Sequence, residues 1–257
     1  WNGEQLIPAW WTEEIGKMRV VIPEDEKKAL THYAYHIKAG KEIFAAEGAF
    51  GQYLICFRDY PVAIGITAGA SEYLAADICL KYIKEAVQIP CEKENLEEAQ
   101  EKLEEKLVHL TLPKPEGDKK DTNEATKKLL NKRIVFTENP RQIESAVIST
   151  VGEELKLELT VAGEKKILFA GYKDWKCNDM YPNDFTKRYH AVSYAFDEDA
   201  LYLSVGLLNT SYREEYCLWV NSENVVVGTW RPNVTYLPAE EDMTWKFTGT
   251  FEPSCIL

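Results

Sequence analysis

Hydrophobic and polar positions alternate most clearly in the second half of the chain. From residue 132 to 257, segments that alternate or run apolar follow one another between short turns, with no helical pattern between them: RIVFTE, SAVIST, ELKLELTV, KKILFAG, YHAVSYAF, LYLSVGLL, EEYCLWVN, NVVVGTW and TWKFTGTF. About nine such strands predict an antiparallel barrel or sandwich. Closure into a barrel would remove exposed strand edges, so we expect an antiparallel β-barrel over 132–257.

Residues 1–90 mix the two periodicities. Pro8 followed by AWWTEEIGKM predicts a short helix. Four segments predict strands, namely 32–38, 41–46, 52–57 and 62–68, and a helix follows the turn at 68–70. Short connections between strands imply antiparallel pairing with helices packed against the sheet. The expected fold class of the whole chain is therefore α+β.

Residues 91–131 separate these two regions. Apolar residues recur there at helical spacing within a strongly charged segment: Leu96, Ala99, Leu103, Leu107 and Leu110. The stretch LPKPEGDKKDTNE that follows is rich in proline and charge and indicates an exposed linker. We therefore expect a domain at 1–90, a helical connector and linker at 91–131, and the barrel at 132–257.

Charge and cysteine usage narrow the function classes. The net charge of −12 argues against a nucleic-acid-binding surface. No apolar run approaches the roughly 18 residues that a membrane-spanning helix needs. The 6 cysteines are widely spaced without a CxxC motif, which favours free thiols in a reducing compartment, and so the bacterial cytoplasm over an extracytoplasmic location. The chain begins at Trp1 with sequence typical of the middle of a domain, so we expect a truncated or processed product.

Few residues suggest chemistry by themselves. His32 and His36 would share one face of a helix, as a metal site needs, but on a strand they lie about 13 Å apart, and we expect no metal site. Ser71 could begin a nucleophile elbow, yet Tyr73 stands where the second glycine belongs, and a helix cap explains the serine. Gly48 and Gly51 weaken the start of a strand, and local sequence alone favours a β-bulge there.

Aromatic residues of the barrel region are candidates for a ligand cavity. The set that we single out is Trp175, Tyr194, Tyr202 and Trp219, and Trp230 and Trp245 belong to the same region. Side chains of this kind also fill the interior of small barrels without binding anything. Both interpretations remain open at this point.

Longer stretches of the first 90 residues resemble a known family. WNGEQLIPAWWTEEI and HYAYHIKAGKEIFAAEGAFGQYLICFRDYPVAIGITAGASEY resemble the C-terminal end of serine β-lactamase-like hydrolases, the family of class C β-lactamases, penicillin-binding-protein relatives and esterases. The shared features are a W-N-G helix entry, a Y-x-Y strand, a G-x-F-G-Q strand start and a strand like VAIGITAG. The later region, from ELKLEL to TWKFTGTF, is similar to the lipocalin-like β-domain appended to some of these hydrolases.

The resemblance implies specific site residues. The family uses the serine of an S-x-x-K motif, a Y-x-N motif, and a third motif, K-T-G or H-x-G, beside the oxyanion hole. Glu47, Gly48 and Ala49 stand at the third motif, and Phe50, followed by Gly51, would offer an oxyanion N–H. Glu47 lacks the positive charge that holds a substrate carboxylate, which favours ester or amide substrates over penicillin-like lactams. The resemblance implies no cofactor.

No serine of this chain is followed by lysine three residues later, so the nucleophile is absent. Three hypotheses follow. The chain is a serine-hydrolase fragment that is inactive alone and is completed by the N-terminal part of the same hydrolase or by a homodimer that completes the sheet. Alternatively, the barrel is a binding module that holds a small apolar ligand or contacts the hydrolase active site. The third hypothesis is a structural domain that serves oligomerisation or placement.

Overall fold

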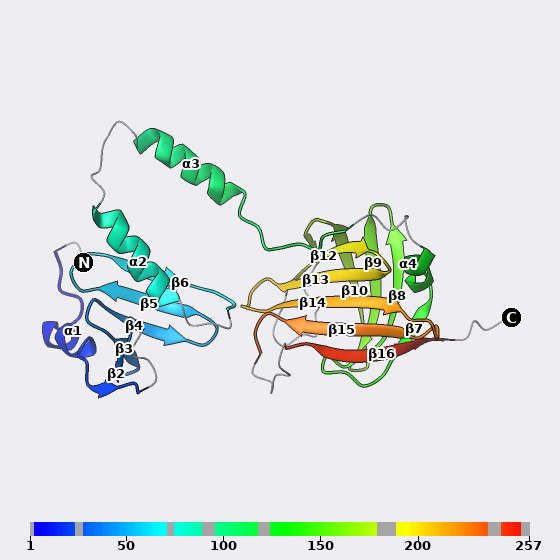
Figure 1. The fold of residues 1–257 in the computed structure, drawn as a ribbon, viewed down its shortest axis with the longest axis horizontal. Coiled ribbons are helices and arrows are strands. Elements are labelled where there is room, and N and C mark those ends of the chain that lie inside the picture. The colour runs from blue at the N-terminus through cyan, green and yellow to red at the C-terminus, as the bar shows by residue number, and fades with distance from the viewer. Residues whose placement is uncertain are drawn as a thin grey trace. The chain divides into compact units, whose positions relative to one another are not determined.

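The computed structural model describes residues 3–23, 28–70, 75–88, 96–117, 124–178, 189–235 and 243–252. The chain divides into two compact units, Trp1–Thr111 and Leu112–Leu257, which we call unit 1 and unit 2 (Figure 1). Unit 1 contains an antiparallel sheet with helices, and unit 2 contains a closed β-barrel. The secondary structure is thus mostly β, with few helices.

Unit 1 is built on a six-stranded antiparallel sheet in the order β1-β2-β3-β4-β5-β6. Its strands are β1 (Val20–Val21), β2 (His32–Ala34), β3 (Ile37–Ala39), β4 (Ile43–Gly48), β5 (Gln52–Phe57) and β6 (Ala63–Ile66). Its helices are α1 (Ala9–Ile15), α2 (Ala75–Gln88) and α3 (Leu96–Val108). The predicted strands at 41–46, 52–57 and 62–68 and the helix after residue 70 are confirmed.

Strand alternation creates the core of unit 1. On β5, Tyr53, Ile55 and Phe57 are buried, whereas Leu54 between them is 55% exposed. The buried face meets Ile43 on β4 and the helix α2, which packs on the same side. Burying one face of a sheet under a helix is what a period of two along the strand predicts.

The prediction of a single strand over 32–38 is wrong. Tyr35 and His36 have φ angles of 51° and 61°, and they form a two-residue turn between β2 and β3. Positive φ at both central residues matches the right-handed twist of the flanking strands, so the chain reverses here. His32 lies on β2 and His36 lies in the turn, which excludes the helical arrangement that a two-histidine metal site needs.

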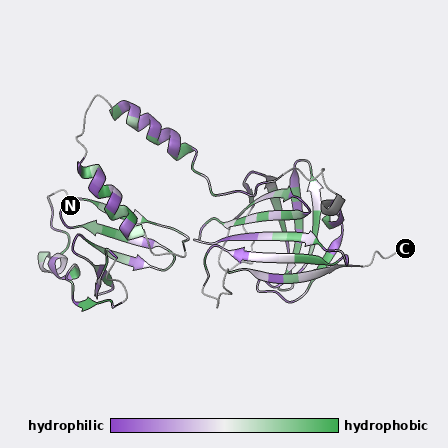
Figure 2. Cartoon of the chain, in the orientation of Figure 1, coloured by the Kyte–Doolittle hydropathy of each residue, from purple (hydrophilic) through white to green (hydrophobic). Residues whose placement is uncertain are grey.

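Helix α3 confirms the helical pattern from Leu96 to Leu107 and ends at Val108, before Leu110. None of its residues is buried, and Leu103 and Leu107 are about half exposed. Hydrophilic residues occupy most of its length (Figure 2). Across the described ranges, each helix is too short or too polar to cross a membrane. The four described cysteines, Cys56, Cys79, Cys177 and Cys217, are free thiols as predicted; Cys91, Cys255 and the proposed cap Ser71 lie outside the described residues.

The described residues of unit 2 form one short helix and ten strands in a single sheet, ordered β10-β9-β8-β7-β16-β15-β14-β13-β12-β11. The elements are α4 (Glu124–Leu129), β7 (Arg133–Phe136), β8 (Ile143–Val151), β9 (Glu154–Val161), β10 (Glu164–Tyr172), β11 (Lys176–Asn178), β12 (His190–Asp197), β13 (Ala200–Leu207), β14 (Arg213–Val220), β15 (Val226–Pro232) and β16 (Trp245–Phe251). All nine strands predicted over 132–257 are present, and β11 and α4 are additional.

The sheet of unit 2 closes on itself. Gly171 and Tyr172 of β10 pair in parallel with Ser193 and Tyr194 of β12, which joins nine strands into a barrel. The first and last strands are neighbours, because Gly249 of β16 pairs with Phe136 of β7. Closure shortens the unpaired strand edges, which promote aggregation.

The interior of the barrel is a continuous apolar core. The largest buried side chains include Tyr194 and Phe196 of β12 and Leu201 of β13, each at most 2% exposed. Leu129 at the end of α4 is fully buried in the same core. The polar linker expected around this position therefore includes a helix whose last residue is part of the barrel packing.

Residues 112–117 cover part of the outer surface of the barrel. The side chain of Lys114 forms an ion pair of 2.9 Å with Asp174, and the Tyr172 hydroxyl donates to the Gly117 carbonyl at 3.2 Å. Gly117 has φ of +137°, and a Cβ there would lie 2.2 Å from the carbonyl oxygen of Phe196. Only glycine fits this close approach. On β12, Ser193 and Ala195 are fully buried although they alternate with inward residues.

Candidate ligand-binding site

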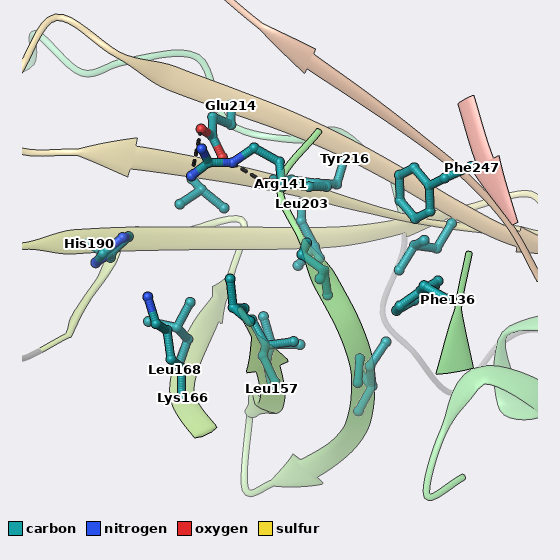
Figure 3. A pocket seen from close by; sticks show the side chains of 17 residues that line it. Phe136, Arg141, Leu157, Lys166, Leu168, His190, Leu203, Glu214, Tyr216 and Phe247 are labelled. Carbon is teal, nitrogen blue, oxygen red and sulfur yellow. Dashed lines mark hydrogen bonds and ion pairs between the residues drawn. The ribbon is translucent and has the colours of Figure 1, made fainter. Parts of the chain in front are cut away.

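A cavity of about 120 Å³ lies inside the barrel of unit 2 (Figure 3). Side chains of β7, β8, β9, β10, β12, β13, β14 and β16 line it, so it occupies the barrel interior and not a surface groove. Most of the lining is aliphatic or aromatic, including Leu157, Leu168, Leu203, Phe136 and Phe247. Apolar cavities of this kind are favourable sites for apolar molecules.

The polar lining residues gather at one side of this cavity. Arg141, Glu214, His190 and Lys166 lie on one side in Figure 3, and Phe136 and Phe247 lie on the other. Arg141 belongs to the loop between β7 and β8, and Glu214 and His190 stand at the starts of β14 and β12. The starts of β12 and β14 lie at the same end of the barrel, because both strands pair antiparallel with β13 between them.

Glu214 is the centre of the polar side. It is 5% exposed, and its Oε1 lies 3.1 Å from Nη2 of Arg141. Its Oε2 accepts a hydrogen bond of 2.7 Å from the Tyr216 hydroxyl. Both carboxylate oxygens therefore have partners, which a buried charge requires.

The charge states of this group follow from its surroundings. Burial, and then the Glu214 carboxylate, raise the pKa of Tyr216 well above 10, so the phenol stays protonated and donates. Burial has the largest single effect on Arg141 and disfavours its charge, but Glu214 and Tyr216 together outweigh it and raise the pKa of Arg141. We refer to Arg141, Glu214 and Tyr216 as the buried triad.

Tyr216 provides a test by pH. Because its folded-state pKa is raised, the unfolded chain releases the phenolic proton first, and its contribution to stability is present below about pH 10 and lost as the pH rises further. The free energy of unfolding falls in both proteins between about pH 9.5 and 11. In Tyr216→Phe the fall is therefore expected to be about 1 kcal/mol smaller than in the unchanged chain. Urea unfolding at the two pH values measures this. Equal losses in both proteins would contradict it.

The aromatic residues singled out from the sequence lie elsewhere. Tyr194 points inward but donates its hydroxyl to the Glu153 carbonyl at 3.0 Å, in the turn between β8 and β9. Tyr202 is 38% exposed, and Trp219 alternates with the buried Leu218. Trp175 donates to the Leu112 carbonyl at 3.4 Å. The cavity described above is lined by other residues.

A sequence signal for Glu214 exists. In the segment EEYCLWV the alternation places Glu214 in phase with Tyr216 and Leu218, which both face the interior. A carboxylate at an inward position is rarely tolerated without a partner. Arg141 has no comparable signal, because it lies in the loop segment ENPRQ, where periodicity carries no information.

The residues that the hydrolase resemblance points to lie together in unit 1. Glu47 and Gly48 end β4, and Ala49 to Gly51 connect it to β5. Phe50 and Gly51 have φ angles of 62° and 84°, so the connection is a tight turn, with Gly48 paired to Gln52. The Glu47 carboxylate forms an ion pair of 2.5 Å with Lys38 on β3.

Metal-binding geometry is not found in the described part of the chain. No group of three or more His, Cys, Asp or Glu side chains there could hold a metal ion. The His32 ring lies 2.9 Å from the Thr31 hydroxyl, and the His36 ring lies 3.2 Å from the Tyr33 hydroxyl. Both rings are thus engaged in local contacts.

Comparisons with known proteins find a distant likeness among solved structures and none in sequence. No family model matches the chain, and no curated protein matches its sequence. Among solved structures, the chain is similar to the crystal structure of a secretary abundant heat soluble (SAHS) protein from Ramazzottius varieornatus, with 14% identity and a TM-score of 0.33 over 42% of this chain and 70% of that one. A likeness of this size does not identify a family.

Proposed function

We propose that the barrel of unit 2 is a binding module for a small, largely apolar molecule. The observation that carries this proposal is the interior cavity of about 120 Å³, lined by apolar side chains and polar on one side. A solidly packed barrel would have supported a purely structural role instead. The buried triad and the neighbouring Lys166 and His190 would orient a ligand that the apolar walls hold.

The size of the cavity limits the ligand. An engineered cavity of about 150 Å³ binds benzene, whereas pockets for drug-sized molecules measure roughly 300–1,000 Å³. The ligand is therefore the size of a single ring or a short alkyl chain. At a ceiling of about 1.5 kcal/mol per non-hydrogen atom, a six-atom ligand binds no more tightly than roughly the submicromolar range.

Binding is tested by NMR titration of the whole chain with benzene. We expect saturable shifts at residues that line the cavity, such as Leu157 and Leu203, with a dissociation constant between roughly 1 µM and 1 mM. Ala146→Leu would fill part of the cavity, because Ala146 lines it and is 4% exposed. This variant is expected to lose binding.

Val135→Leu is the matched control, because it enlarges a side chain on the neighbouring strand that is 40% exposed. It should bind benzene as the unchanged chain does. Hydrogen exchange of β12 amides shows that each variant remains folded. Absence of saturable binding to the unchanged chain at millimolar benzene would contradict the proposal and favour a structural or oligomerisation role.

For unit 1 we propose a second role, as the C-terminal portion of a serine-hydrolase domain. Support comes from the sequence resemblance and from the tight turn at Phe50 and Gly51, which brings backbone close to the end of the sheet. Because the chain has no S-x-x-K motif, it should show no esterase activity and no labelling by a fluorophosphonate. If a serine of this chain were labelled stoichiometrically, the inference that the nucleophile lies in another segment would be wrong.

A further inference from the structure

The apolar side chains of helix α3 form a stripe that the described residues leave exposed. Leu96, Leu103 and Leu107 are 49%, 50% and 54% exposed, and no residue of α3 is buried in the described part of the chain. An isolated helix of 13 residues is only marginally stable in water, because packing of an apolar face supplies most of the stability of helices in proteins. The stripe therefore calls for a partner.

The stripe is symmetric about Leu103. Ala99 and Leu96 stand four and seven positions before Leu103, and Leu107 and Leu110 stand four and seven positions after it. At about 100° per residue, all of them lie within about 40° of Leu103 around the helix axis. Leu110 follows the helix, and its N–H donates to the Leu107 carbonyl at 3.3 Å, which keeps it next to the last turn. Such a stripe is complementary to itself when two copies run in opposite directions.

Charge and side-chain size favour the antiparallel direction over the parallel one. Glu97 and Glu98 lie in the first turn of α3, and Lys106 lies in the last turn. An antiparallel pair places the acidic end of one helix beside the basic end of the other, whereas a parallel pair brings the acidic ends together. The antiparallel pair also sets the small Ala99 opposite the large Leu107, while a parallel pair would set alanine against alanine and leave a gap.

We infer that α3 is an interface at which two copies of this chain pair antiparallel about a two-fold axis at Leu103. Leu103 meets Leu103 of the other copy, Leu96 meets Leu110, and Ala99 meets Leu107, since these positions are equally far from the axis. An interface of one short helix lies below the roughly 1,200 Å² typical of stable complexes, so we expect a dissociation constant of roughly 10–500 µM. This inference depends on neither of the proposed functions.

Sedimentation equilibrium of the whole chain between about 10 and 500 µM measures the association. Leu103→Glu sets two carboxylates against each other at the two-fold axis, and we expect it to weaken the dimer at least about tenfold. Val108→Glu is the matched control, because it makes the same change in charge on a side chain that is 79% exposed and lies about 140° around the helix from Leu103. It should dimerise as the unchanged chain does.

Disulfide formation between copies tests the direction of the helices. Leu103→Cys brings two thiols together at the axis, so oxidation should link position 103 of one copy to position 103 of the other. Leu96→Cys faces Leu110 of the other copy and should not link to itself, as it would in a parallel pair. Glu101→Cys lies on the opposite face of α3 and should stay unlinked. Peptide mapping by mass spectrometry distinguishes these links from links to the native cysteines.

Three results would overturn the inference. The first is an unchanged chain that stays monomeric up to about 500 µM. The second is a dimer that Leu103→Glu and Val108→Glu affect equally, which would mean that the copies meet at another surface, such as an edge of the unit 1 sheet. The third is self-linking of Leu96→Cys as complete as that of Leu103→Cys. Should Leu103→Glu unfold the helix, the disulfide variants still decide.

Discussion

Replacing Phe196 with alanine is expected to lower the free energy of unfolding of the barrel by about 3–5 kcal/mol. The side chain is 2% exposed, and its ring lies 5.9 Å from that of Tyr194 in the same core. Alanine would leave a void, since neighbouring strands held in a closed barrel cannot collapse to fill it. Native-state hydrogen exchange of β12 and β13 amides in the whole chain measures the loss.

Tyr202→Ala is the matched control for this core substitution. Tyr202 lies on β13, the strand next to Phe196, but is 38% exposed on the outer surface. Its truncation should cost less than about 1 kcal/mol. Similar losses for the two variants would mean that the inward and outward faces of β12 and β13 are assigned wrongly.

Arg141→Met is expected to destabilise the barrel by about 3 kcal/mol, because it leaves the carboxylate of Glu214 buried with only the Tyr216 hydroxyl as a partner. The value lies at the lower end for a broken buried pair, since Arg141 is 37% exposed and water can approach the site. Urea unfolding of the whole chain at neutral pH measures the effect.

Adding Glu214→Gln to Arg141→Met removes the stranded charge and should recover at least half of the lost stability. Glu214→Gln alone completes the double-mutant cycle. It is expected to lower the free energy of unfolding by less than Arg141→Met does, because the Arg141 side chain that it leaves without its partner is partly exposed. A double variant as unstable as Arg141→Met would show that the ion pair is not the source of the loss.

The regular strands of the barrel were predictable because each carries enough alternating residues to specify its buried face. Segments such as ELKLELTV and LYLSVGLL meet this condition, and both form strands at the expected positions. The three-residue β11 does not, because its position depends on pairing with β12. Helix α4 has no clear sequence signal for a similar reason, since Leu129 is buried only when the barrel provides a core for it.

The candidate site was less predictable than the fold. Aromatic residues marked the barrel region correctly, but composition does not say which of them face a cavity. Arg141 comes from a loop, and its ion pair with Glu214 depends on the packing of strands that are distant in sequence. In unit 1, the hairpin turn at Tyr35 and His36 was hidden because neither residue is a glycine or an asparagine, the usual signals for such turns.

The pairing of β7 with β16 has a consequence for synthesis. The barrel cannot close until residue 251 has left the ribosome, because Phe136 and its neighbours find their partners only there. At about 5–20 residues per second, β7 waits roughly 6–24 s with one edge unpaired. We therefore expect the barrel of unit 2 to fold only after β16 has emerged, and the nascent strands to depend during that interval on protection from aggregation.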